Sequence, residues 1–139
     1  MSRSRSVAAG AAAALVWGAA ERVDRRLFAN DYTDVALLGK SVTRSRAWPV
    51  VGVAIHAANG AVFGLAFDLV RHRSRLTPRR LALGLALAEH LALFPLGALV
   101  DRYHPARGEP GLEQVYGGRA FAQATFRHAL FGVVLGRLG

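Results

Sequence analysis

Four long apolar segments dominate this chain of 139 residues. They cover residues 7–28, 48–70, 80–100 and 119–138, and charged residues are sparse within them. A helix needs ~20 predominantly apolar residues to cross the hydrocarbon core of a bilayer. A soluble helix of this length would show a charged outer stripe, whereas these segments are rich in Gly and Ala, as in closely packed membrane helices. The sequence therefore predicts an all-α fold: a four-transmembrane-helix bundle forming a single integral membrane domain over residues 1–139.

The composition narrows the classes of protein and of site. The chain has no cysteine, which excludes a disulfide scaffold, a thiol enzyme and a cysteine-ligated zinc or iron–sulfur site. Its net charge of +9 admits a soluble, Ala-rich helical bundle that binds nucleic acid as the alternative to a membrane protein. However, the basic residues lie mostly between the apolar segments, where they would contact lipid headgroups. We therefore predict the lipid bilayer as a partner and no nucleic acid.

The loops predict an orientation. Residues 71–80, RHRSRLTPRR, contain five arginines and no acidic residue, so this loop and both termini are expected in the cytoplasm. Residues 32–45 resemble an amphipathic segment lying on the membrane surface. Residues 1–20 also fit a cleaved secretory signal, although the internal repeat described next argues that they are retained. The Ala, Arg and Gly content is typical of a high-GC bacterium, and we predict the bacterial cytoplasmic (inner) membrane.

The chain contains an internal repeat. The pattern His-x-x-x-Gly-x-x-x-Gly starts at His56 in the second segment and at His128 in the fourth. The dipeptide Ala-Glu occurs in the first and third segments, where it contributes Glu21 and Glu89. This arrangement indicates two repeated helical hairpins, each with a glutamate on its first helix and a histidine on its second. The small residues at every fourth position predict that each histidine lies on a packed helix face.

The four ionisable residues of the repeat form the predicted site. Helical spacing places Glu21, His56, Glu89 and His128 at similar depths, where each group needs a partner or a function. One interpretation is a divalent metal site with these four residues as ligands, or a site that handles protons. A second is a set of interhelical hydrogen bonds, including a Glu89–Arg127 ion pair, in a structural, accessory or transport subunit. The third is a bis-histidine haem b between His56 and His128.

Other polar residues are expected to support this cluster. Asn59 neighbours the His56 face, and Gln123 shares a second face of the last segment with Arg127. Arg127 must pair, reach the membrane surface or line a wet cavity. His90 is about 100° around the helix from Glu89, so only one of the two is expected to point inward.

The function class stays open at this point. No Ser–His–Asp order, phosphate-binding loop or HExxH motif occurs, so whether the protein is an enzyme is undecided. A homo-oligomer and a partner membrane subunit are both compatible with the small-residue faces.

A known family has counterparts of three features of this chain. They are the Ala20-Glu21 pair, the interfacial segment, and the two histidine repeats, of which the first includes Phe63. The chain resembles the uncharacterised small bacterial inner-membrane proteins of the YagU-like kind over most of its length. This resemblance implies a few Gly/Ala-rich helices with an early glutamate, and residence in the membrane. It implies no established reaction.

Overall fold

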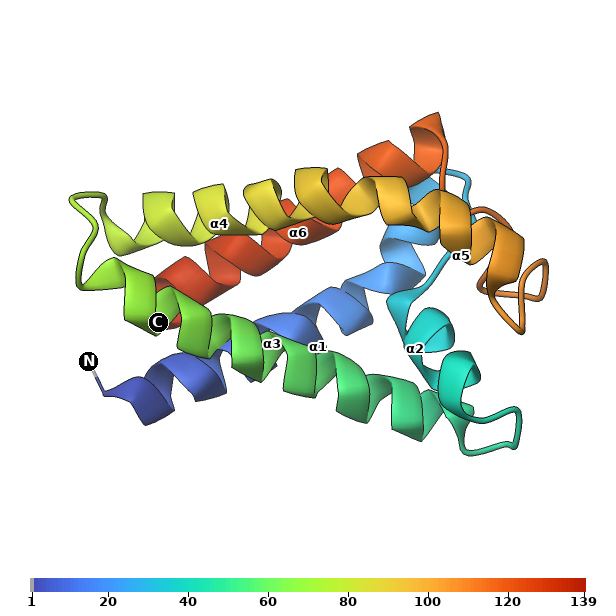
Figure 1. The fold of residues 1–139 in the computed structure, drawn as a ribbon, viewed down its shortest axis with the longest axis horizontal. Helices are drawn as coiled ribbons and strands as arrows, with labels where there is room; N and C mark the ends of the chain where they lie inside the picture. The colour runs from blue at the N-terminus through green and yellow to red at the C-terminus, as the bar shows by residue number, and fades with distance from the viewer. Residues whose placement is uncertain (1) are drawn as a thin grey trace.

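The computed structural model describes residues 2–139, and the fold is all-α, as predicted (Figure 1). The elements are α1 (Arg3–Leu27), α2 (Asp34–Val42), α3 (Trp48–Arg71), α4 (Pro78–Leu93), the 3₁₀ helix η1 (Phe94–Leu96), α5 (Gly97–Tyr103) and α6 (Gly118–Leu138). Within this range extended pairing is limited to one isolated bridge between Tyr32 and Leu112. The four predicted segments correspond to α1, α3, the run from α4 to α5, and α6.

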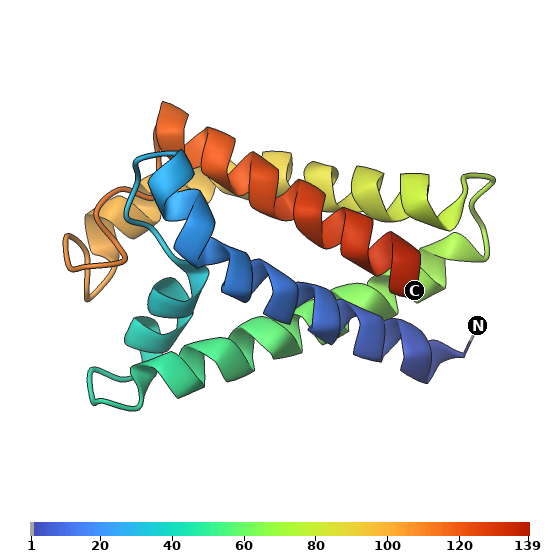
Figure 2. The same cartoon turned by 180° about the vertical axis from the view of Figure 1, so that it is seen from behind.

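The long helices form two pairs. Helix α1 crosses α3 in close contact, α4 runs along α6, and α6 also packs against α1 (Figures 1 and 2). Helices α3 and α4 are joined by a short loop at one end and separate from each other toward the other end (Figure 1). Both chain termini lie at the end where this loop is, which we call the narrow end. The shorter helices α2 and α5 lie at the opposite, wide end.

Glycines bring the backbones of α1 and α3 together. A Cβ atom added to Gly60 would lie 2.6 Å from the Cβ of Ala14, and one added to Gly64 would meet the backbone of Ser6. The second predicted stripe is also a packing face, because a Cβ on Gly132 would lie 2.7 Å from the Cα of Leu83. Each small-residue stripe therefore fits against the first helix of its own hairpin.

The predicted surface segment, residues 32–45, becomes α2 and packs against α3. Thr33 caps this helix, with its hydroxyl oxygen accepting from the Ala36 N–H at 3.0 Å. A Cβ on Gly39 would meet the Trp48 carbonyl, and a Cβ on Gly52 would meet the carbonyl of Val35. One face of α2 is thus covered by protein, which the amphipathic pattern alone does not reveal.

Two helices, not the predicted four, are long and apolar enough by length and composition to cross a membrane. They are α3 and the continuous run Pro78–Tyr103, which changes to 3₁₀ geometry around Pro95. Helices α1 and α6 fall outside this group, and both carry charged residues within their length. Only 28% of the most apolar stretch of α3, and 17% of that of Pro78–Tyr103, is buried inside the protein. These helices therefore direct most of their apolar surface outward.

Candidate functional site

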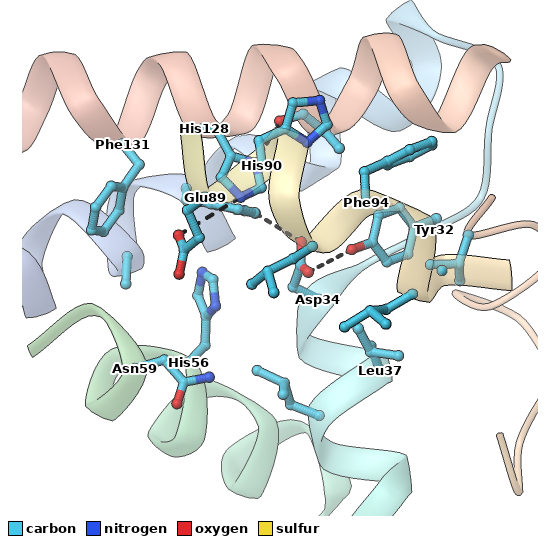
Figure 3. A pocket seen from close by; sticks show the side chains of 18 of the residues that line it. Tyr32, Asp34, Leu37, His56, Asn59, Glu89, His90, Phe94, His128 and Phe131 are labelled. Carbon is cyan, nitrogen blue, oxygen red and sulfur yellow. Dashed lines mark hydrogen bonds and ion pairs between the residues drawn. The ribbon is translucent and has the colours of Figure 1, made fainter. Parts of the chain in front are cut away.

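A cavity of about 300 Å³ lies where α3 and α4 separate (Figure 3). This volume is at the lower end of the range for small-molecule sites. Aromatic rings and aliphatic side chains make up most of its wall. The polar residues in the wall are Tyr32, Asp34, His56, Asn59, Glu89, His90 and His128. Three of the four predicted site residues, His56, Glu89 and His128, therefore line one cavity, and the fourth, Glu21, does not.

His128 and Glu89 face each other across this cavity. The Nδ1 atom of His128 lies 2.7 Å from the Ala124 carbonyl oxygen, and a carbonyl only accepts, so Nδ1 carries the hydrogen. The other ring nitrogen, Nε2, lies 4.0 Å from a carboxylate oxygen of Glu89 (Figure 3). In neutral His128 this Nε2 presents a lone pair. At 4.0 Å the two groups are too far apart for a hydrogen bond, but they are close enough for an ion pair when the imidazole holds a proton.

His90 also lines the cavity, contrary to the prediction that only one residue of the Glu89-His90 pair points inward. The Thr125 hydroxyl donates to the Phe121 carbonyl at 2.8 Å and lies 2.9 Å from Nε2 of His90. The hydroxyl hydrogen is used in the first bond, so the His90 Nε2–H donates to the hydroxyl oxygen. Nδ1 of His90 is then a lone pair, buried and without a hydrogen-bond partner within residues 2–139. Both residues fit because His90 is directed at α6 while Glu89 reaches the gap toward α3.

His56 enters the cavity from α3. Its side chain is buried, and its Nε2 atom has no hydrogen-bond partner among the described residues. The indole of Trp17 packs edge-on against His56 and His128, with ring centroids 5.0 and 4.6 Å apart respectively. Asn59 lies near His56 at the more exposed edge of the wall (Figure 3).

Arg127 belongs to a separate buried group at the wide end. Its guanidinium forms two 2.6 Å bonds to the Asp24 carboxylate, from Nε and from Nη2. Nη1 lies 3.0 Å from Asp34 and 3.5 Å from Glu21. We call Glu21, Asp24, Asp34 and Arg127 the arginine cluster. It replaces the predicted Glu89–Arg127 ion pair, because the α1 and α2 carboxylates surround the guanidinium.

Gln123 completes the surroundings of the arginine cluster. Its amide nitrogen donates to Asp24 at 2.8 Å, and its amide oxygen accepts from the side chain of Asn30 at 2.9 Å. Gln123 and Arg127 both lie on the buried side of α6, on one face as the helical spacing predicts. Asp24 and Asp34 were not predicted, although Asp24 follows Glu21 at the i,i+3 spacing that places both on one face of α1.

The electrostatics of the wide end depend on the guanidinium. Burial alone would raise the pKa of Asp34, but the neighbouring Arg127 charge holds the pKa of this carboxyl below its usual value. Burial raises the pKa of Tyr32 well above its usual range, and the nearby Asp34 carboxylate adds to this effect. The Tyr32 hydroxyl donates to Asp34 at 2.6 Å, so it remains a hydrogen-bond donor.

The residues present do not fit the predicted metal site. Glu21 accepts from the Asp34 N–H at 2.6 Å, so it is held in the arginine cluster and away from the other three predicted ligands. Over residues 2–139, no group of three or more His, Asp and Glu side chains is arranged to hold a metal ion. The bis-histidine haem b fits no better, because the Trp17 indole contacts both imidazoles that would have to bind the iron.

Comparisons with known proteins add no assignment. The chain matches no family model, no curated protein and no solved structure.

Proposed function

We propose that this chain is an integral membrane protein of the bacterial cytoplasmic membrane, in which the less apolar helices α1 and α6 cross the bilayer beside α3 and the Pro78–Tyr103 run. In this proposal the cavity between α3 and α4 binds a membrane-soluble small molecule, and binding is linked to a proton held by Glu89 and His128. The observation that carries the proposal is the position of this pair inside a largely apolar cavity, 4.0 Å apart.

Membrane residence is supported by the apolar outer surface. Exposed aliphatic residues occur on all four long helices, for example Leu15 of α1, Val62 of α3, Leu91 of α4 and Val133 of α6. A soluble monomer rarely leaves most of a long apolar helix uncovered, since exposure of apolar surface to water costs free energy in proportion to area. Lipid would cover these faces.

Proton handling is supported by the chemistry of the pair. An ionised carboxylate in an apolar cavity needs a counter-charge or a proton, and His128 offers the Nε2 lone pair beside it. The side chain of Glu89 is 41% exposed, so other protein atoms do not seal it off. The pair is therefore both accessible and able to change its charge.

Small-molecule binding is supported by the cavity wall, which is largely apolar with a few polar side chains. Nε2 of His56 and Nδ1 of His90 are buried without a partner among the described residues, but neither atom is accessible from the cavity in this conformation. The second interpretation from the sequence, interhelical hydrogen bonding, suits Glu21, Gln123 and Arg127, whose partners are all protein atoms.

Infrared difference spectroscopy of the purified protein during a pH titration tests the proton step. We expect a carboxylic-acid C=O band that disappears as the pH is raised, is absent in Glu89→Gln, and titrates at a different pH in His128→Gln. Glu113→Gln is the matched control, since Glu113 is an exposed loop residue. A spectrum unchanged by Glu89→Gln would show that Glu89 exchanges no proton and would overturn the proposal.

A further inference from the structure

We infer that the ligand of this cavity is a lipophilic organic monocation, an amine or a quaternary ammonium with an apolar body. Its charge would lie at Glu89. This inference rests on the proposed function and names the substrate class of the same site.

The charges around the cavity favour a cation. Two carboxylates line it, and that of Asp34 is already paired with Arg127 at 3.0 Å. Glu89 has His128 as its one ion-pair neighbour within residues 2–139, and His128 is charged only when it holds a proton. When the proton leaves this pair, the Glu89 carboxylate in the cavity is therefore ionised and has no counter-charge. A monocation supplies that counter-charge, and an anion would be repelled.

The hydrogen-bonding groups also favour a donor. Nε2 of neutral His128 and Nδ1 of His90 are both lone pairs, as their bonds to Ala124 and Thr125 require. Lone pairs accept from the N–H of an ammonium group and give nothing to a carbonyl or a phosphate oxygen. Nδ1 of His90 is closed off from the cavity, so an amine ligand is matched as a donor by Nε2 of His128.

Aromatic rings supply the rest of the recognition. Trp17, Phe63 and Phe131 line the cavity, and the Phe63 and Phe131 rings pack edge-to-face with centroids 5.1 Å apart. The face of an aromatic ring attracts a cation and does not distinguish N–H from N–CH₃ groups. A quaternary ammonium ion donates no hydrogen bond, so the carboxylate and the rings would hold it without the added hydrogen bond of an amine.

Proton and cation compete for one carboxylate. In the empty cavity one proton is held by Glu89 or by His128; when the cation binds, this proton leaves to water and the carboxylate remains ionised. The other titratable groups that line the cavity are His56 of α3, His90 of α4, Asp34 of α2 and Tyr32. Asp34 keeps its charge through Arg127, so the exchange involves one proton for one cation. Affinity for the cation should fall as the pH is lowered.

Calorimetric titration of the detergent-purified protein tests this inference. The probe is benzyltrimethylammonium, and the matched control ligand is neopentylbenzene, its neutral carbon isostere. We expect saturable binding of the cation with about tenfold or greater preference over the isostere, and a similar loss of affinity in Glu89→Gln, because a unit charge is removed at close range. Glu113→Gln should bind as the wild type does. Circular dichroism checks that each variant is folded.

Proton release measured with a pH indicator in weak buffer completes the test. Binding should release about one proton per cation, since one carboxylate loses its proton, and none in Glu89→Gln. Phe131→Leu gives a second variant if Glu89→Gln fails to fold, and should weaken the cation more than the isostere. Equal binding of both ligands, or full affinity in folded Glu89→Gln, would overturn the inference. If Glu89 titrates in the infrared spectrum but no cation binds, the inference fails while the proposed proton site stands.

Discussion

Arg127 is the residue on which the junction between α1, α2 and α6 depends. Its side chain is fully buried, and it also lies over the Tyr32 ring, 4.7 Å from the centroid. The surrounding carboxylates come from two helices, so a single cation joins three elements. In an interior of low dielectric such charges are stable only together.

We expect Arg127→Gln to lower the free energy of unfolding by about 3–5 kcal/mol, the usual cost of leaving a buried charge without its partner. Chemical unfolding in detergent measures the change. The double variant Asp24→Asn/Arg127→Gln should recover part of the loss, because one orphaned carboxylate is removed. Arg137→Gln, an exposed arginine on the same helix, is the control. An equal loss of unfolding free energy in Arg127→Gln and Arg137→Gln would contradict a special role for Arg127.

Asp34 makes the stability of the wide end pH-dependent. Its pKa is lowered in the folded chain, so the ionised form is favoured by folding. That contribution is complete above about pH 4, the usual aspartate pKa, and is lost as the pH falls through the lower folded value. We expect the melting temperature to fall below this pH. Asp34→Asn should melt at a lower temperature at pH 7, and its melting temperature should fall less steeply as the pH is lowered. If the fall is as steep as in the wild type, other carboxylates are responsible for it.

The sequence predicted the candidate residues only where the spacing of residues along a helix determines how deep each one lies in the bundle. His56, Glu89 and His128 meet because their positions along the helices match, and depth is what counting residues provides. Glu21 was misplaced because the hydrogen bond from the Asp34 N–H arises from the turn between α1 and α2. No periodicity encodes that turn. The tautomers of His90 and His128 likewise follow from their contacts.

At the scale of elements, glycines determine how closely the helices approach. We expect Gly60→Ala to destabilise the protein by about 1–3 kcal/mol, since a new methyl group would overlap Ala14 and the backbone of α1. Gly84→Ala is the matched control, because no atom lies within 4 Å of its added Cβ. In a helix interior that change should cost nothing and can stabilise by up to about 1 kcal/mol. Thermal or chemical unfolding of both variants measures whether steric overlap or helix propensity determines the change in stability at Gly60.

The long helices were predictable because their apolar runs are long and their ends carry recognisable signals. Trp48-Pro49 opens α3, and Thr77-Pro78 opens α4, with Thr77 accepting from the Arg80 N–H. The contact of α2 with α3 was not predictable, since it depends on Gly39 and Gly52 meeting in space. An amphipathic pattern indicates that one face of a helix is buried, but it does not indicate whether protein or lipid covers that face.

At the scale of the whole molecule, the narrow end carries basic residues with almost no acidic ones, whereas the basic residues of the wide end are mixed with acidic ones. The start of α1, the α3–α4 loop, the start of α4 and the end of α6 contribute Arg3, Arg5, Arg71, Arg73, Arg75, Arg79, Arg80 and Arg137. The acidic residue of this end is Asp68, which pairs with Arg71 at 3.2 Å. The α3–α4 loop region, with five arginines and no acidic residue in residues 71–80, is the basis on which we propose the narrow end as the cytoplasmic one.

Cysteine labelling tests this orientation, and the natural chain has no cysteine to interfere. We expect Leu76→Cys in the α3–α4 loop to resist a membrane-impermeant maleimide in intact cells and to react after the membrane is permeabilised. Ser45→Cys at the opposite end should react in intact cells. Both residues are exposed. The reverse labelling pattern would invert the proposed topology, and labelling of both sites in intact cells would argue against a spanning protein.

Helices α3 and α4 contact each other only sparsely. The size of the cavity between them therefore depends on the angle between the α1–α3 pair and the α4–α6 pair. The α1–α3 pair is locked by backbone contacts at its glycines, and the α4–α6 pair by those at Gly132 and Gly136. A rotation of one pair against the other would change the volume between Glu89 and His56 and leave both sets of glycine contacts intact. The α1–α6 contact and the arginine cluster would be the axis of such a rotation, and in the proposed function a ligand would widen its own entrance in this way.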